Sequence, residues 1–84
     1  MFLHITAIRE VKRFELILEF SDGSLKLVDL SKELYGEAFL PLTDPAFFRR
    51  VEINSETRTI EWPNGADFAP EFLHAIGEEI KQVA

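Results

Sequence analysis

Residues 60–73 read IEWPNGADFAPEFL and join the last predicted strand to the only long predicted helix. This stretch holds the only tryptophan, Trp62, with two of the four prolines and one of the four glycines. Trp62 is large and apolar, so we expect it to anchor the strand in the core. Pro63-Asn64-Gly65 is a typical turn sequence, and Pro70 suits the first position of a helix. The stretch is therefore predicted to be a structural junction.

The segment after this junction has the periodicity of an amphipathic helix. From residue 70 to about residue 82, apolar side chains recur at spacings of three and four and so share one face. Gly77 lies inside this pattern, where glycine is less favourable than alanine by about 1 kcal/mol. We predict a C-terminal helix over 70–82, with a close approach to the sheet at Gly77. Its apolar stripe consists of Phe72, Leu73, Ile76, Ile80 and Val83.

A β-hairpin is predicted in the first third of the chain. Over residues 14–20, large apolar side chains occupy every second position, which is the pattern of a half-buried strand. Asp22-Gly23 follows, and this dipeptide is typical of a two-residue type I′ turn, in which both positions need a positive φ. Such a loop would place Glu19 opposite Lys26, an opposite-charge pair. The same register pairs Phe20 with Leu25, Leu18 with Leu27, and Ile17 with Val28.

Shorter elements are predicted on both sides of this hairpin. Residues 3–11 contain several β-branched side chains and are expected to form a first strand. Ser31 is a candidate cap for a short helix over 32–35 that ends at Gly36. Thr43 or Asp44, followed by Pro45, is a typical start of a second short helix. Residues 51–54 and 58–62 are expected to form a second hairpin, with its loop near 55–57.

Together these elements predict an α+β fold in a single domain over 1–84. The expected sheet is small and antiparallel, with two hairpins in four or five strands, and it packs against the C-terminal helix. One or two short helices lie beside it. The chain has 84 residues, 46% of them apolar, which is enough for one modest core.

Composition narrows the compartment and the class of partner. The chain has no cysteine, which fits a reducing compartment, and it shows neither a signal-peptide pattern nor a membrane-spanning apolar run. We therefore expect a cytoplasmic protein without membrane contact. The net charge is −6, and residues 51–84 hold seven acidic side chains against Arg58 and Lys81. This balance argues against direct nucleic-acid binding. The acidic surface either keeps the protein soluble or attracts a basic partner.

Carboxylates and one histidine near the last helix are the candidates for chemistry. Glu71, His74 and Glu78 would share one helix face and could hold a metal ion, but a solvated charged face is the commoner role of this pattern. Asp67 and Glu71 could form an acid–base pair, but Asp67 is more simply a cap of the turn or the helix. No serine lies in the glycine-framed elbow of a nucleophile. We predict no catalytic, metal-binding or cofactor-binding residue.

Aromatic side chains exceed what a thin core needs, since eight of the residues are phenylalanine. Trp62 and Phe48 are expected in the core. For Phe39 and Phe68, a core position and a place in an exposed binding patch are equally supported. The candidate interaction residues, all in the junction, are Asn64, Asp67, Phe68 and Glu71.

A series of short motifs runs through the chain: FSDG at 20–23, VDL at 28–30, LTDP at 42–45, IEWPNGAD at 60–67 and PEFL at 70–73. In order and spacing it resembles the small bacterial family known as domain of unknown function 2442. The resemblance implies a compact α+β fold with a meander-like antiparallel sheet and a C-terminal helix. Members of this family are commonly encoded beside another small protein. Some are associated with toxin–antitoxin-like pairs, and others carry a following helix-turn-helix domain.

The predicted function is that of a non-enzymatic protein-interaction module, the antitoxin-like member of a pair whose partner is encoded by an adjacent gene. One alternative is a small-molecule binder or enzyme that uses Asn64, Asp67 and Glu71. Another is an accessory module of a transcription regulator. The sequence ends at Ala84 with no room for a helix-turn-helix domain, so direct DNA contact is not expected. An edge strand over 3–11 or 51–54 could also pair two copies into a homodimer. The basic side chains available to the transcription alternative are Arg9, Lys12, Arg13, Arg49 and Arg50.

Overall fold

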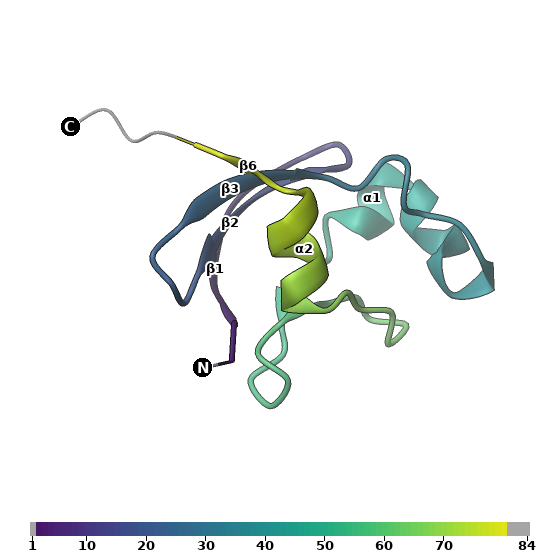
Figure 1. Cartoon of the computed structure of the whole chain (residues 1–84). Coiled ribbons are helices and arrows are strands. Elements are labelled where there is room, and N and C mark those ends of the chain that lie inside the picture. Colours follow the sequence, from purple (N-terminus) through teal and green to yellow (C-terminus); the bar gives the residue numbers. More distant parts are fainter. Residues whose placement is uncertain (1, 81–84) are drawn as a thin grey trace.

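The computed structural model describes residues 2–80, which form two antiparallel sheets and three short helices. The larger sheet has the strand order β1-β2-β3-β6. Its strands are β1 (Ile5–Lys12), β2 (Glu15–Phe20), β3 (Leu25–Asp29) and β6 (Glu78–Glu79). The helix α2 (Pro70–Ile76) lies under this sheet and packs against β3 (Figure 1). The α+β fold predicted from the sequence is confirmed.

The β2–β3 hairpin forms where the sequence predicts it, but the predicted register is wrong by one residue. The Phe20 amide donates a hydrogen bond to the Ser24 carbonyl at 2.9 Å, so the loop contains Ser21 as well as Asp22 and Gly23. Gly23 has a φ of 88°, the left-handed conformation that closes a three-residue hairpin loop. The extra loop residue displaces every pair of the hairpin by one position.

This shift sends two charged side chains to opposite faces of the sheet. Lys26 lies opposite Leu18, whose side chain is in the core, so Lys26 faces α2. Glu19 lies opposite Leu25 and forms an ion pair with Arg9 of β1. The predicted pair between Glu19 and Lys26 is therefore wrong.

The C-terminal helix is shorter than predicted. It ends at Ile76, and Gly77 leads directly into β6, which pairs with β3. The Ile80 amide continues this pairing with a hydrogen bond of 2.8 Å to the Leu25 carbonyl. The spacing of Ile80 thus fits a helical stripe, but the residue lies at the edge of the sheet. The remainder of the predicted helix, with Val83, lies outside the described residues.

Gly77 marks a close approach between α2 and the sheet, as the sequence predicts. A Cβ atom on Gly77 would lie 3.0 Å from the Lys26 Cβ and 3.0 Å from the Leu73 carbonyl oxygen. Contacts this short are rarely made by real side chains. Glycine therefore lets the chain turn from the helix into β6 directly against β3.

Two short helices connect the sheet to the second hairpin. The helix α1 (Pro45–Phe48) begins as predicted, with the Asp44 carboxylate accepting a hydrogen bond from the Ala46 amide at 3.0 Å. A 3₁₀ helix, η1 (Glu37–Thr43), precedes it and was not predicted. The helix predicted over 32–35 is wrong. The Asp29 carboxylate binds the Ser31 amide at 2.9 Å, which makes a turn where the sequence offered a helix cap.

The second hairpin consists of β4 (Glu52–Ile53) and β5 (Ile60–Glu61). Its place in the sequence is as predicted, but it forms a sheet of its own and does not extend the larger one. The Ile5 amide donates to the Arg58 carbonyl at 2.9 Å, which attaches this hairpin to the start of β1. This bond joins the two sheets at one corner, and the β4–β5 hairpin lies beneath the larger sheet (Figure 1).

The core lies between the larger sheet and the elements beneath it. Trp62 is 1% exposed, and its Nε1 donates to the Phe48 carbonyl at 2.9 Å. The expected core positions of Trp62 and Phe48 are confirmed. The remaining buried apolar side chains are Ile5, Leu16, Leu18, Phe20, Val28, Leu30, Leu42, Val51, Ile60, Ala66 and Leu73.

Among residues 2–80, no helix combines the length and the apolar character that crossing a membrane requires.

The loop carboxylate Asp22 connects the hairpin to α2. Its Oδ1 accepts hydrogen bonds from the Ser24 hydroxyl at 2.6 Å and the Ser24 amide at 2.9 Å, and its Oδ2 lies 2.9 Å from His74 Nε2. These contacts, the Ser24 hydroxyl first, lower the pKa of Asp22 from 3.8 to about 2. The other ring nitrogen, His74 Nδ1, lies 3.5 Å from the Lys26 ammonium nitrogen, so the imidazole bridges the hairpin loop and β3.

We expect the Asp22 contacts to make stability depend on acid pH. The folded pKa lies below the unfolded value of 3.8, so the ionised carboxylate stabilises the fold above pH 3.8 and loses that effect as pH falls towards about 2. The melting temperature of Asp22→Asn should therefore lie below that of the parent protein at pH 6 and approach it near pH 2. Thermal unfolding followed by circular dichroism tests this. Melting temperatures that stay equally far apart at every pH would contradict it.

Candidate functional site

A shallow groove of about 290 Å³ is lined by residues of α2, of the stretch before it and of residues 33–39. We call it the aromatic groove. Aromatic rings form most of its wall, and two carboxylates stand among them. Its lining residues are Glu33, Tyr35, Phe39, Asp67, Phe68, Ala69 and Phe72.

Two parts of the chain that are distant in sequence bring the rings together. Phe39 belongs to η1, Phe68 to the stretch between β5 and α2, and Phe72 to the first turn of α2. Phe68 lies at the centre, stacked on Phe39 with ring centroids 4.8 Å apart and on Phe72 at 5.7 Å. Trp62 meets the edge of Phe68 at 6.0 Å. The stack therefore rests on the hydrophobic core.

The groove is supported by hydrogen bonds as well as by packing. The Thr59 hydroxyl, the only buried polar side chain of the described residues, donates to the Phe68 carbonyl at 2.6 Å. Asn64 Nδ2 donates to the Ala38 carbonyl of η1 at 2.9 Å, and Asn64 Oδ1 accepts from the Ala66 amide at 3.2 Å. Asn64 thus joins the turn to η1. It supports the groove without lining it.

The rim of the groove is unusually apolar for exposed surface. Tyr35 is 74% exposed and Phe72 is 36% exposed. These are two of the four exposed large hydrophobic side chains among residues 2–80, the others being Phe2 and Leu40. Phe72 was predicted to face the core, but Leu73 takes that position. Consecutive helical residues lie about 100° apart, and in α2 Leu73 points into the core while Phe72 points towards Phe68 and the surface.

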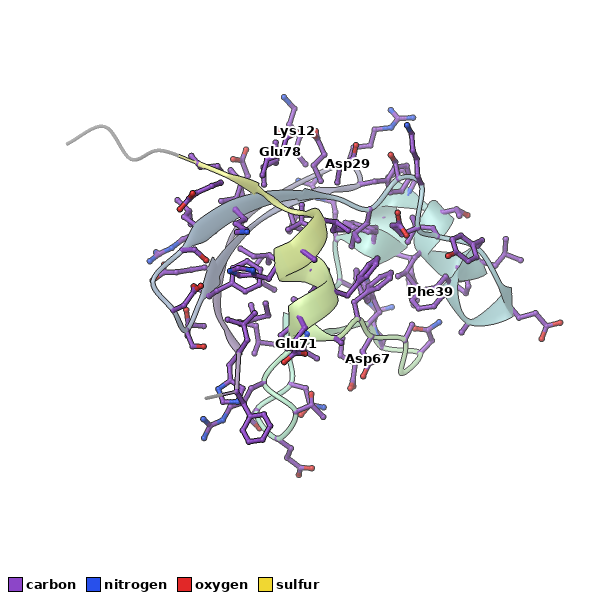
Figure 2. All side chains as sticks on the ribbon, viewed as in Figure 1. Lys12, Asp29, Phe39, Asp67, Glu71 and Glu78 are labelled. Carbon is purple, nitrogen blue, oxygen red and sulfur yellow. The ribbon has the colours of Figure 1, made fainter. Side chains whose placement is uncertain are left out.

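The fold brings only some of the candidate interaction residues into the groove. Asp67 and Phe68 line it, while Asn64 stands behind it. Glu71 is exposed on α2, and Figure 2 shows it with Asp67 and Phe39 on the side of the sheet that α2 covers. Lys12, Asp29 and Glu78 project from the opposite face (Figure 2). Glu33, Tyr35 and Phe72 were missed by the sequence analysis. For Phe72 the sequence did contain a signal, because Phe72 and Leu73 are adjacent and adjacent helical residues point in different directions.

Asp67 does not cap α2, contrary to the sequence-based interpretation. The N-cap position is Ala69, which makes no side-chain capping bond, and Pro70 begins the helix. The backbone of Asp67 forms a bridge with Glu61, and its side chain is exposed at the groove. Proline at the first helical position lacks an amide hydrogen, so this end of the helix needs fewer hydrogen-bond acceptors.

The candidate metal ligands do not share one helix face. Glu78 lies in β6, because α2 ends before it, and His74 is bonded to Asp22. His74 also packs against Phe20, with ring centroids 5.0 Å apart. The histidine therefore connects the helix to the hairpin loop, and the predicted Glu71–His74–Glu78 face does not form.

The model of a family described as a protein of unknown function, DUF2442, matches residues 5–79 of the chain. This chain is a member of the DUF2442 family. The match begins with the first residue of β1 and ends with the last residue of β6, so it spans the whole larger sheet. Searches among curated proteins and among solved structures each find no match to the chain.

The DUF2442 chain has a second hollow, larger and more polar, beside the β4–β5 hairpin. It measures about 760 Å³ and is lined by side chains of both charges, among them Arg49, Arg50, Glu52 and Glu56. Its Glu61 carboxylate already accepts a hydrogen bond from Asn54 at 3.0 Å. Mixed charge and the absence of an exposed aromatic wall among these residues make it a weaker recognition surface than the aromatic groove.

The basic side chains considered for a transcription role are largely engaged within the molecule. Arg9 pairs with Glu19. The Arg13 and Arg50 guanidinium groups lie over the rings of Phe14 and Phe47, at 5.7 Å and 5.8 Å from the centroids. Contacts of this kind compete with the phosphate contacts that nucleic-acid binding requires.

Proposed function

We propose that this DUF2442 chain is a non-enzymatic protein-interaction module that binds a small protein through the aromatic groove. The observation that carries the proposal is the stack of Phe39, Phe68 and Phe72, part of which is exposed beside Tyr35. Exposed aromatic residues at the edge of a rigid core supply much of the binding energy in protein interfaces. The stack is held by contacts between parts of the chain that are distant in sequence, so it presents a preformed surface.

The charge of the groove favours a basic partner. Glu33 and Asp67 line it, and the whole chain carries a net charge of −6. Opposite charge on a partner would speed association and fix its orientation. A second copy of this chain would instead place carboxylates against carboxylates. The partner at this groove is therefore a different protein.

A small-molecule function fits the groove less well. Its volume of about 290 Å³ falls just below the range of about 300–1,000 Å³ that is usual for ligand pockets, and it is open to solvent. It suits one or two side chains of a docking protein.

We propose that the partner is encoded by an adjacent gene and that both proteins are cytoplasmic, since a chain without cysteine fits a reducing compartment. The DUF2442 chain would neutralise this partner by covering its basic surface, as an antitoxin does.

Co-purification with the adjacent gene product tests the proposal. The tagged DUF2442 chain and this product are co-expressed and captured at low ionic strength. Tyr35→Ala removes an exposed ring, and Asp67→Lys reverses a charge of the groove. Each substitution should reduce the retained partner at least about fivefold, the effect expected of a residue central to an interface.

Matched controls remove or reverse comparable groups elsewhere. Phe2→Ala removes another exposed ring, and Glu10→Lys reverses an exposed charge on β1. Both should retain the partner like the parent chain, and all four variants should keep their melting temperatures because the substituted residues are exposed. If the adjacent product is not retained at low ionic strength, or if the groove variants retain it as well as the controls do, the proposal is overturned.

A further inference from the structure

The aromatic groove contains two carboxylates without an ionic partner among residues 2–80. Among residues 2–80, Arg9 forms an ion pair with Glu19, and His74 forms one with Asp22 when the imidazole is protonated; neither contact includes Glu33 or Asp67. The side chains of Glu33 and Asp67 also make no hydrogen bond to any described residue, although Glu33 is half-buried. Covering such groups with an uncharged partner would remove their hydration without replacing it.

We infer that the partner inserts an arginine side chain into this groove. The inference rests on the proposed function and specifies the group that the groove recognises. The three methylene groups of arginine can lie against the exposed ring of Phe72 beside Phe68, as long cationic side chains do on apolar surfaces. The planar guanidinium then reaches Glu33 and Asp67, which enter the groove from different segments. One side chain thus satisfies both the apolar wall and the carboxylates.

Other anchors satisfy only part of the groove. A leucine or phenylalanine would contact the rings but leave both carboxylates desolvated. A lysine ammonium is a compact, strongly hydrated charge that neither stacks on a ring nor spans two carboxylates. Arginine already lies over phenylalanine rings elsewhere in this chain, with Arg13 over Phe14 and Arg50 over Phe47. The same type of contact is therefore possible in the groove.

A peptide titration tests the arginine anchor separately from the natural partner. The probe is Ac-Gly-Gly-Arg-Gly-Gly-NH₂, and its control carries citrulline, which keeps the planar shape and the stem but has no charge. Amide resonances of the isotope-labelled chain are followed by NMR. The arginine peptide should shift the resonances of Phe39, Asp67, Phe68 and Phe72, and the citrulline peptide should bind about tenfold more weakly. A lysine peptide should lie between them.

Variants of the chain complete the test. Glu33→Gln and Asp67→Asn keep the shape of each side chain but remove its charge, and should abolish most of the preference for arginine over citrulline. Glu10→Gln removes one charge from the other face of the sheet and should leave the preference unchanged. Equal affinity for both peptides, or shifts confined to residues outside the groove, would overturn the arginine anchor. If the adjacent product is still captured through Tyr35 in that case, the proposed function stands and only the anchor fails.

Discussion

Replacing Trp62 with alanine should lower the free energy of unfolding by about 3–5 kcal/mol. Trp62 is almost completely buried, contacts the rings of Phe48 and Phe68, and donates a hydrogen bond to the Phe48 carbonyl. Alanine would leave a cavity at the place where α1, β5 and the aromatic groove meet. A domain of this length is expected to have a total stability of about 4–12 kcal/mol. The substitution therefore removes a large part of it.

Urea unfolding followed by circular dichroism measures this effect, since the variant lacks the only tryptophan. Trp62→Phe is the matched control. It keeps a ring in the core and loses the indole hydrogen bond, so it should lose only about 1–2 kcal/mol. The Phe48 carbonyl still accepts a bond from the Val51 amide at 3.3 Å. A loss below about 1 kcal/mol for Trp62→Ala, as at a surface position, would show that Trp62 is not the anchor of the core.

Replacing Gly77 with alanine should destabilise the fold by about 1–3 kcal/mol. The backbone at Gly77 has a φ of −72°, which any residue adopts, so alanine would ordinarily stabilise this position by about 0.4–1 kcal/mol. The opposite sign is expected because the new methyl group would lie 3.0 Å from the Lys26 Cβ. Lys26 has little freedom to move away, since its ammonium donates to the His74 carbonyl at 2.8 Å.

Hydrogen exchange shows where this destabilisation acts. In Gly77→Ala the Ile80 amide, which is bonded to Leu25, should exchange faster than the global loss of stability explains, because β6 separates from β3 first. Gly23→Ala is the control: a methyl group there meets no atom within 4 Å, but the positive φ is strained. That variant should lose stability without selective loss of Ile80 protection. Unchanged or increased stability of Gly77→Ala would refute the close approach.

The sequence predicted most elements of this fold, because their signals are local. The helix after Asp44 begins with a capping bond between Asp44 and the nearby Ala46 amide, so a short stretch of sequence is enough to predict it. The strands of the hairpins follow their alternating patterns. The errors have physical causes. The conformation of Gly23 adds a loop residue that Asp-Gly alone does not reveal. Ile80 fits both a helical stripe and an edge strand, and pairing with β3 decides between them.

Only some of the groove residues could be predicted from the sequence, because its walls come from segments that are far apart in the chain. Asp67 and Phe68 were candidates through their place in the turn. Tyr35 was assigned to a helix that does not form, and Glu33 is 34 residues away from Asp67 in the chain. Which residues line a surface between such distant segments depends on tertiary packing. Local periodicity carries no information about it.

The direct passage from α2 to β6 has a consequence for the thermodynamics of association. A single residue, Gly77, separates them, so α2 cannot shift without breaking the bond between Ile80 and Leu25. Phe72 and Phe68 are thus held in position before any partner arrives. Immobilising a mobile side chain on binding costs about 0.5–1.5 kcal/mol in entropy, and of the groove's rings only Tyr35 is exposed enough to lose much of it. In the complex that we propose, most of the ordering entropy would therefore fall on the partner.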